Sequence, residues 1–139
     1  MRGLVKRENP AFKKLALAAE AGKAGNYRKA EKILGELITE SDAPPEAWLL
    51  LGRALHGLKD YSRALAAFND YLKLRPRSSQ GYLFAGRTYL ALGLPYKAVP
   101  LLRKALDCNP LDLEVMALLG IAYLKSKHSQ AAVDLLQEA

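Results

Sequence analysis

The chain has 139 residues, half of them hydrophobic, and a formal net charge of +7. This length fits one domain, and no apolar run approaches the roughly 18 residues that a membrane-spanning helix needs. A single cysteine excludes an internal disulfide and a thiolate metal cluster. The N-terminus has no signal-peptide core, so we expect a soluble, cytoplasmic chain with no metal, cofactor or membrane partner.

One 34-residue period runs through the chain and sets the order of the predicted elements. The recurring small and large apolar positions are Gly52, Gly86 and Gly120; Ala30, Ala64, Ala98 and Ala132; Leu34, Phe68, Leu102 and Leu136. Such a period indicates one unit stacked on copies of itself, because a single copy cannot bury its own apolar face. We expect a basic lead-in over 1–10 and one domain over 11–139. Its copies are placed at about 11–44, 45–78, 79–112 and 113–139, the last one truncated.

Each copy is predicted to be two helices joined by a short turn. In the second copy, Trp48, Leu51 and Leu55 fall on one face of a first helix, and a break at Lys59-Asp60 precedes the second helix. This pattern predicts an all-α chain in which small residues allow the two helices of a pair to approach closely.

Caps and prolines mark the second helices of the pairs. Asn26 and Asp60 can accept hydrogen bonds from the first free N–H groups, and Pro95 suits a first helical position. His128 holds the same turn position in the fourth copy. Pro100 follows inside a helix, and we expect a bend or a 3₁₀ or π adjustment just before it.

The pattern of the second copy resembles the tetratricopeptide repeat. Its eight signature positions read Trp48, Leu51, Gly52, Leu55, Ala64, Phe68, Tyr71 and Pro76. The resemblance implies a right-handed α-solenoid of four stacked helix-turn-helix pairs. It also implies a protein–protein interaction scaffold that binds a partner segment in a concave groove lined by the first helices.

Nine groove residues follow from this resemblance by their position in each copy. They are Arg53, Arg87, His56, Leu49, Leu83, Leu90, Ile121, Lys23 and Lys125. The two arginines hold the same position of adjacent copies above an apolar floor, which suits a peptide with an acidic or C-terminal carboxylate. The alternative is that both arginines pair with local acids such as Glu46 and Glu114.

The carboxylate clamp that binds chaperone tails in some members of this family is not matched. Leu15, Ala19 and Leu50 stand where the clamp requires lysine and two asparagines. We therefore expect a different protein partner.

Two other functions compete with protein binding. The second and third copies carry most of the positive charge, which would suit a nucleic-acid-binding helical array, although no aromatic ladder accompanies the charge. The chain could also be a structural segment of a larger protein. Because it stops before the fourth copy reaches its proline, we expect a fragment of a longer protein or self-association through this end.

Catalysis has no candidate residues in this sequence. Cys108 takes the place of Leu74 one copy earlier, so we expect a small core residue rather than a reactive thiol. The two histidines have no carboxylate or thiol at ligand spacing. We predict that the chain is not an enzyme.

Overall fold

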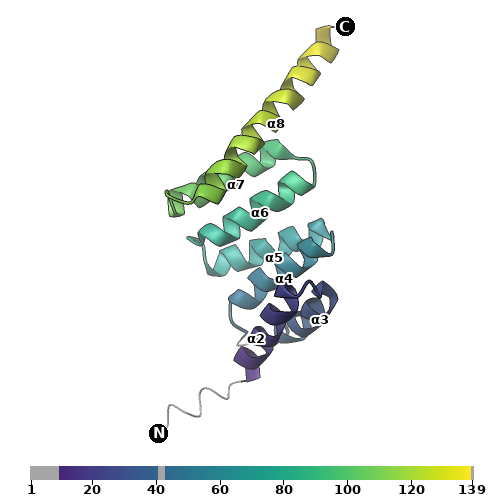
Figure 1. The fold of residues 1–139 in the computed structure, drawn as a ribbon, viewed down its shortest axis with the longest axis vertical. Helices are drawn as coiled ribbons and strands as arrows, with labels where there is room; N and C mark the ends of the chain where they lie inside the picture. The colour runs from purple at the N-terminus through teal and green to yellow at the C-terminus, as the bar shows by residue number, and fades with distance from the viewer. Residues whose placement is uncertain (1–9, 41–42, 139) are drawn as a thin grey trace. The chain divides into compact units, whose positions relative to one another are not determined.

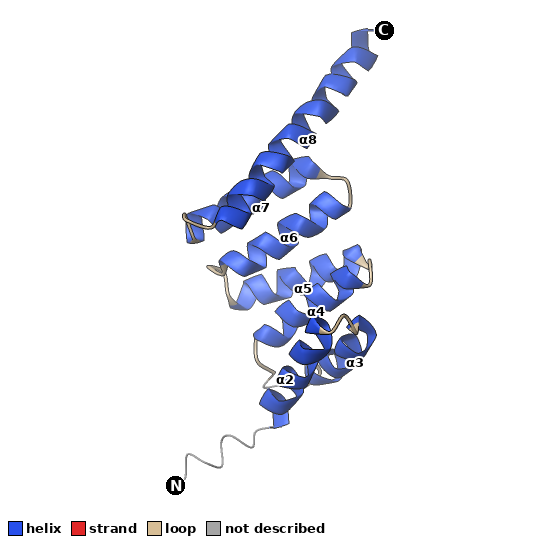
Figure 2. Ribbon diagram, in the orientation of Figure 1, coloured by secondary structure: helices blue, strands red, loops and turns tan. Residues whose placement is uncertain are grey.

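The computed structural model describes residues 10–40 and 43–138, with side chains described as far as residue 127. This part of the chain contains seven helices and no strand (Figures 1 and 2). The helices are α2 (Pro10–Lys23), α3 (Tyr27–Leu37), α4 (Glu46–Gly57), α5 (Tyr61–Leu74), α6 (Ser79–Ala91), α7 (Pro95–Cys108) and α8 (Leu113–Glu138). The prediction of an all-α helical repeat is confirmed. The chain divides into two compact units at Pro76, the first holding α2 to α5 and the second α6 to α8.

The first unit contains two helix pairs, α2 with α3 and α4 with α5, and α3 also packs on α4. Both predicted caps form: the side chain of Asn26 accepts from the N–H of Lys29 at 3.3 Å, and that of Asp60 accepts from the N–H of Arg63 at 3.4 Å. The fully buried side chains include Leu34, Leu37, Leu55 and Phe68. The repeated apolar positions therefore form the core of this unit.

The second unit contains the pair α6 and α7, and α8 packs mainly on α7. Leu102 and Ala98 of α7 and Val115 of α8 are fully buried in one cluster. Ser78 caps α6, because its hydroxyl accepts from the N–H of Gly81 at 3.2 Å. The helical start at Pro95 is confirmed.

Of the two changes expected near Pro100, the 3₁₀ or π adjustment is wrong, and the bend stays a prediction. Helix α7 stays an α-helix from Pro95 to Cys108 with Pro100 inside it. Pro100 lies only one and a half turns from the start of the helix. Its missing N–H therefore removes one bond near the N-terminus, and the helix absorbs the loss without changing its type.

The fourth copy is not a helix pair, which corrects the predicted turn at His128. Helix α8 runs continuously from Leu113 to Glu138, and its C-terminal part extends beyond α6 and α7 (Figure 1). In the first three copies the turn contains a residue with positive φ: Gly25 at 81°, Lys59 at 65° and Gly93 at 78°. Glycine adopts this conformation without strain, and an aspartate cap follows Lys59. The fourth copy offers Lys127 and His128, which supply neither a glycine nor a strong cap, so the helix continues.

Cys108 is exposed, so the expectation of a core residue is wrong. The equivalence with Leu74 holds, but Leu74 is itself 49% exposed. Both are the last residues of their helices, and the packed positions end one turn earlier, at Tyr71 and Ala105. Cys108 and Leu74 therefore share the same environment, but it is the solvent-exposed end of a helix and not the core.

Candidate functional site

In the first unit, the predicted groove residues differ in their access to solvent. Leu49 of α4 is buried, with 6% of its surface exposed, and offers little area to a ligand. Arg53, one turn further along α4, is exposed, and His56 is half-buried. The His56 ring packs edge-on against Tyr61 with centroids 5.2 Å apart, which holds the imidazole at the end of α4. Lys23 is exposed in the last turn of α2.

In the second unit, Arg87 of α6 has a defined partner. Its guanidinium lies 3.0 Å from a carboxylate oxygen of Glu114 at the start of α8, and 5.8 Å from the centre of the Phe84 ring. Leu83 is buried, with 5% exposed, and Leu90 is half-buried against the same core. The two leucines predicted for the groove floor in this unit are thus mostly used for packing within it.

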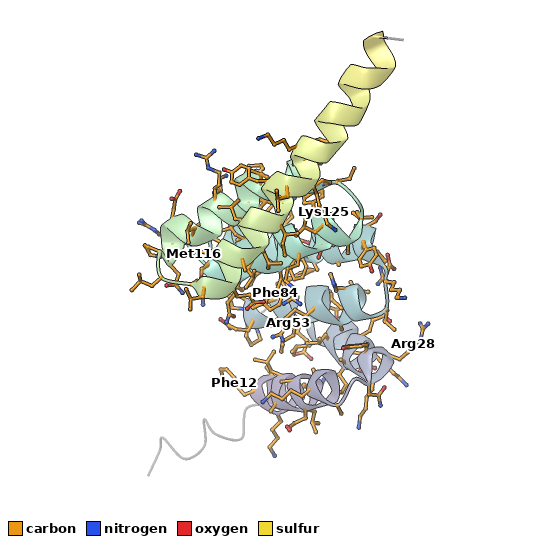
Figure 3. All side chains as sticks on the ribbon, turned by 45° about the horizontal axis from the view of Figure 1, so that its top comes forward. Phe12, Arg28, Arg53, Phe84, Met116 and Lys125 are labelled. Atoms are coloured by element: carbon orange, nitrogen blue, oxygen red, sulfur yellow. The ribbon has the colours of Figure 1, made fainter. Side chains whose placement is uncertain are left out.

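The two remaining predicted residues lie on α8. Ile121 is 43% exposed and Lys125 is also exposed. Figure 3 labels Arg53, Phe84 and Lys125 on their helices, and each side chain can be followed there. The accessible members of the predicted set are therefore Lys23, Arg53 and His56 in the first unit, and Arg87, Ile121 and Lys125 in the second.

The alternative of local acid partners holds for Arg87, which pairs with Glu114. Glu46, the other acid considered, lies 3.8 Å from Arg75. About half of each side chain in the Arg87–Glu114 pair is exposed. An ion pair with this exposure contributes only ~0–1 kcal/mol to stability, so another carboxylate can compete with Glu114 for the guanidinium.

A shallow cleft on the second helices was not predicted. It lies in the first unit, where α3, α4 and α5 meet, and is lined by Arg28, Glu31, Lys32, Gly35, Glu36, Ile38, Thr39, Leu51 and Arg63. Arg63 of α5 reaches Glu31 of α3 at 3.0 Å and Asp60 at 3.5 Å. The hydrogen bond with Glu31 raises the pKa of Arg63 above its ordinary value. In the sequence, the sign of this cleft is a mixture of acidic and basic residues in the second helices of the first two copies.

The basic residues of α7 contact aromatic rings in their own unit. The ammonium of Lys97 lies 5.9 Å from the centre of the Tyr89 ring, and that of Lys104 lies 5.7 Å from the centre of the Tyr82 ring. Such contacts are favourable cation–π arrangements. Each lysine therefore lies over one face of a tyrosine ring of its own unit.

The described residues include no group of three or more histidine, cysteine, aspartate or glutamate side chains that could hold a metal ion. No helix in this part of the chain combines the length and apolar character needed to cross a membrane.

Known proteins share this pattern and this fold. A family model described as tetratricopeptide repeat matches residues 15–79 and 85–139. The chain is 38% identical over 105 residues to cellulose synthase operon protein C of Pseudomonas fluorescens (strain SBW25), a match that covers 74% of this chain and 8% of that protein. The chain thus spans a small part of the length of this relative.

Solved structures of tetratricopeptide repeat proteins are similar to this chain. MamA from Desulfovibrio magneticus RS-1 is similar with a TM-score of 0.77 and 26% identity, over 93% of this chain and 73% of that chain. The first TPR domain of human RPAP3 gives a TM-score of 0.82 at 17% identity, over 87% of this chain and 95% of that one. The TPR2B domain of yeast Sti1, solved as a complex with pHsp70, gives 0.77 at 17% identity, over 83% and 97%. The last two share the fold.

Proposed function

Because this chain belongs to the tetratricopeptide repeat family, we propose that it acts as a scaffold that binds a segment of another protein along the first helices of its pairs. The exposed polar groups of α4 and α6 are the contacts that this proposal uses. They fit a partner segment that carries an acidic side chain or a C-terminal carboxylate.

The observation that carries this proposal is the contact between Arg87 and Glu114. The guanidinium already holds a carboxylate at 3.0 Å, beside the face of Phe84. A partner carboxylate that replaced Glu114 would make the same charge-assisted hydrogen bond. The Phe84 ring would keep the guanidinium in place during this exchange.

In the first unit, Arg53 and His56 offer a second polar contact on α4. They are three residues apart and so lie on one face of the helix. The imidazole is held by Tyr61, and it can donate a hydrogen bond to a carboxylate in either of its protonation states. We propose that this pair contacts a carboxylate of a partner segment on the first unit.

A peptide display library with free C-termini, followed by fluorescence anisotropy on the selected peptides, tests the proposal. We expect that amidation of the C-terminus, or replacement of acidic residues, weakens binding. Arg53→Ala and Arg87→Ala should each weaken it about tenfold or more, because a hydrogen bond to a charged group contributes ~1.5–3 kcal/mol. Glu114→Gln should strengthen it, because the internal competitor for Arg87 is removed.

The double variant Lys97→Ala/Lys104→Ala is the matched control. It removes the same charge from second-helix positions in α7, and it should leave peptide affinity unchanged. A larger effect from this control than from Arg53→Ala/Arg87→Ala would place the binding surface on the second helices instead.

Nucleic acid is the competing ligand, favoured by the exposed basic residues of the second and third copies, such as Arg63, Lys97 and Lys104. A salt titration with a generic RNA and a generic duplex DNA separates the two functions. Binding that falls steeply with salt would support nucleic acid, and no binding at low salt would remove it.

A further inference from the structure

Large hydrophobic side chains are concentrated on the surface around the start of α8. Those exposed between residues 111 and 124 are Leu111, Leu113, Met116, Ile121, Tyr123 and Leu124. Exposed apolar side chains gathered in this way on a globular protein indicate an interaction site. This surface belongs to the second unit and is separate from the polar contacts used in the proposed function.

Most of these residues form one stripe along α8. With 3.6 residues per turn, Leu113, Met116, Ala117, Gly120, Tyr123 and Leu124 all fall within about a third of the helix circumference, and we call this set the α8 stripe. The buried residues Val115 and Ala122 lie on the opposite side, in the core of the unit. Figure 3 shows Met116 near the start of α8. Ile121 lies about a quarter turn away from Gly120, outside the stripe.

The glycine of the stripe is placed for close contact with another helix but has no contact of that kind. A Cβ at Gly52 would collide with the ring of Phe68, and a Cβ at Gly86 would lie 2.8 Å from Leu102. Each of these glycines is covered by the second helix of its own pair. A Cβ at Gly120 would meet nothing within 4 Å in the part of the chain that the structure describes. The close-approach surface is present in the fourth copy, but no helix covers it in the described part of the chain.

The stripe is self-complementary about Gly120. When two α8 helices run antiparallel with their two glycines opposed, Ala117 faces Tyr123 of the other copy, so a small residue meets a large one. Met116 then faces Leu124, which pairs two flexible apolar side chains. Self-complementarity of this kind is what an isologous two-fold interface requires.

Charge agrees with the same register. The antiparallel arrangement brings Lys127 of one copy next to Asp112 of the other, at both ends of the seam. The Oδ1 atom of Asp112 already caps α8 by accepting from the N–H groups of Glu114 at 3.0 Å and Val115 at 3.2 Å. A lysine of the second copy would complement this carboxylate.

From these observations, we propose that a second copy of this chain covers the α8 stripe, with the two α8 helices antiparallel about a two-fold axis at Gly120. The seam from Leu113 to Lys127 is only ~21 Å long at 1.5 Å per residue. Interfaces at the small end of the range are weak and transient. The dimer should therefore form in the micromolar range and dissociate on dilution.

Sedimentation velocity of the full 139-residue chain over a concentration series tests the proposal. We expect a monomer–dimer equilibrium for the wild type and at least a tenfold higher dissociation constant for Met116→Asp. Ile121→Asp is the control: Ile121 is 43% exposed and Met116 is 41% exposed on the same helix, but only Met116 is in the stripe. Circular dichroism and a thermal melt of each variant check that it folds.

A cysteine cross-link tests the register. In a Cys108→Ser background, Gly120→Cys should form an intermolecular disulfide under mild oxidation, because the axis places the two positions opposite each other. Leu113→Cys should not cross-link, since its counterpart lies at the far end of the seam. Cross-linking at both positions would mean parallel helices.

Four results would overturn the proposal. They are a strict monomer at all concentrations, a dimer that Met116→Asp leaves intact, a dimer that Ile121→Asp disrupts equally, and cross-linking at Leu113. A monomer in which Met116→Asp strongly lowers stability would show that the stripe is covered within one chain. None of these measurements depends on peptide binding, so the proposed function stands or fails separately.

Discussion

Substituting alanine for Gly86 and for Gly120 should have opposite effects on stability, although both glycines hold the same position of the repeat. Both substitutions gain the same helix propensity, about 0.8–1.0 kcal/mol in a helix interior. At Gly86 the new methyl would lie 2.8 Å from Leu102 Cγ and Cδ2, and Leu102 is fully buried, so it cannot move aside. Overpacking of this kind costs about 1–3 kcal/mol. At Gly120 the methyl meets nothing in the described structure within 4 Å.

The difference between the two variants isolates the steric cost. We expect Gly120→Ala to raise the free energy of unfolding by up to ~1 kcal/mol. Its free energy of unfolding should exceed that of Gly86→Ala by ~1–3 kcal/mol. Both residues lie in the second unit, so one unfolding transition reports on both. The assay is urea denaturation followed by far-UV circular dichroism, at a concentration low enough to keep copies apart. Equal destabilisation by the two substitutions would refute the reasoning, because it would mean that Gly120 is covered in the monomer.

Three further predictions concern the core, a cap and the missing turn. Phe68→Ala should lower the free energy of unfolding by ~3–5 kcal/mol, because Phe68 is fully buried. Phe12→Ala, at a 58% exposed position, should change it by less than ~0.5 kcal/mol. Chemical denaturation of both variants measures the two changes. Asp60→Ala removes the cap of α5 and should cost ~1 kcal/mol, while Asp60→Asn restores most of it in the same assay. The double variant Lys127→Gly/His128→Asp introduces the glycine and the cap that form turns in the other copies. NMR chemical shifts should then show a break in α8. An unbroken helix in this variant would mean that tertiary contacts, not turn residues, keep α8 continuous.

The repeat period predicted the fold because it records which positions pack. Ala64, Phe68, Ala98 and Leu102 are all fully buried, as their 34-residue spacing indicated. The caps Asn26 and Asp60 were predicted for a local reason, since their side chains must satisfy N–H groups of their own helices. Both kinds of inference use constraints that lie within one repeat or between neighbouring positions.

The same reasoning predicted the candidate site less well than the fold. Position within the repeat selected Leu49 and Leu83 for the groove, but both are buried. A periodic position tells which side of a helix a residue occupies, and it does not tell how much of that side the neighbouring helices cover. The pairing of Arg87 with Glu114 was identified as an alternative, whereas the contact of Glu46 with Arg75 joins the first turn of α4 to the end of α5, which no repeat position indicated.

The fourth copy shows how the two kinds of constraint can separate. Its first-helix positions keep the repeat, including Met116 and Gly120, and so keep a surface shaped for a second helix. Its turn positions have lost the residues that reverse the chain, and α8 runs straight through them. Because α8 does not fold back, its apolar face has no second helix against it among the residues that the structure describes. An exposed apolar face with a glycine at its centre then favours association with a helix of matching shape, and α8 of a second copy carries that shape.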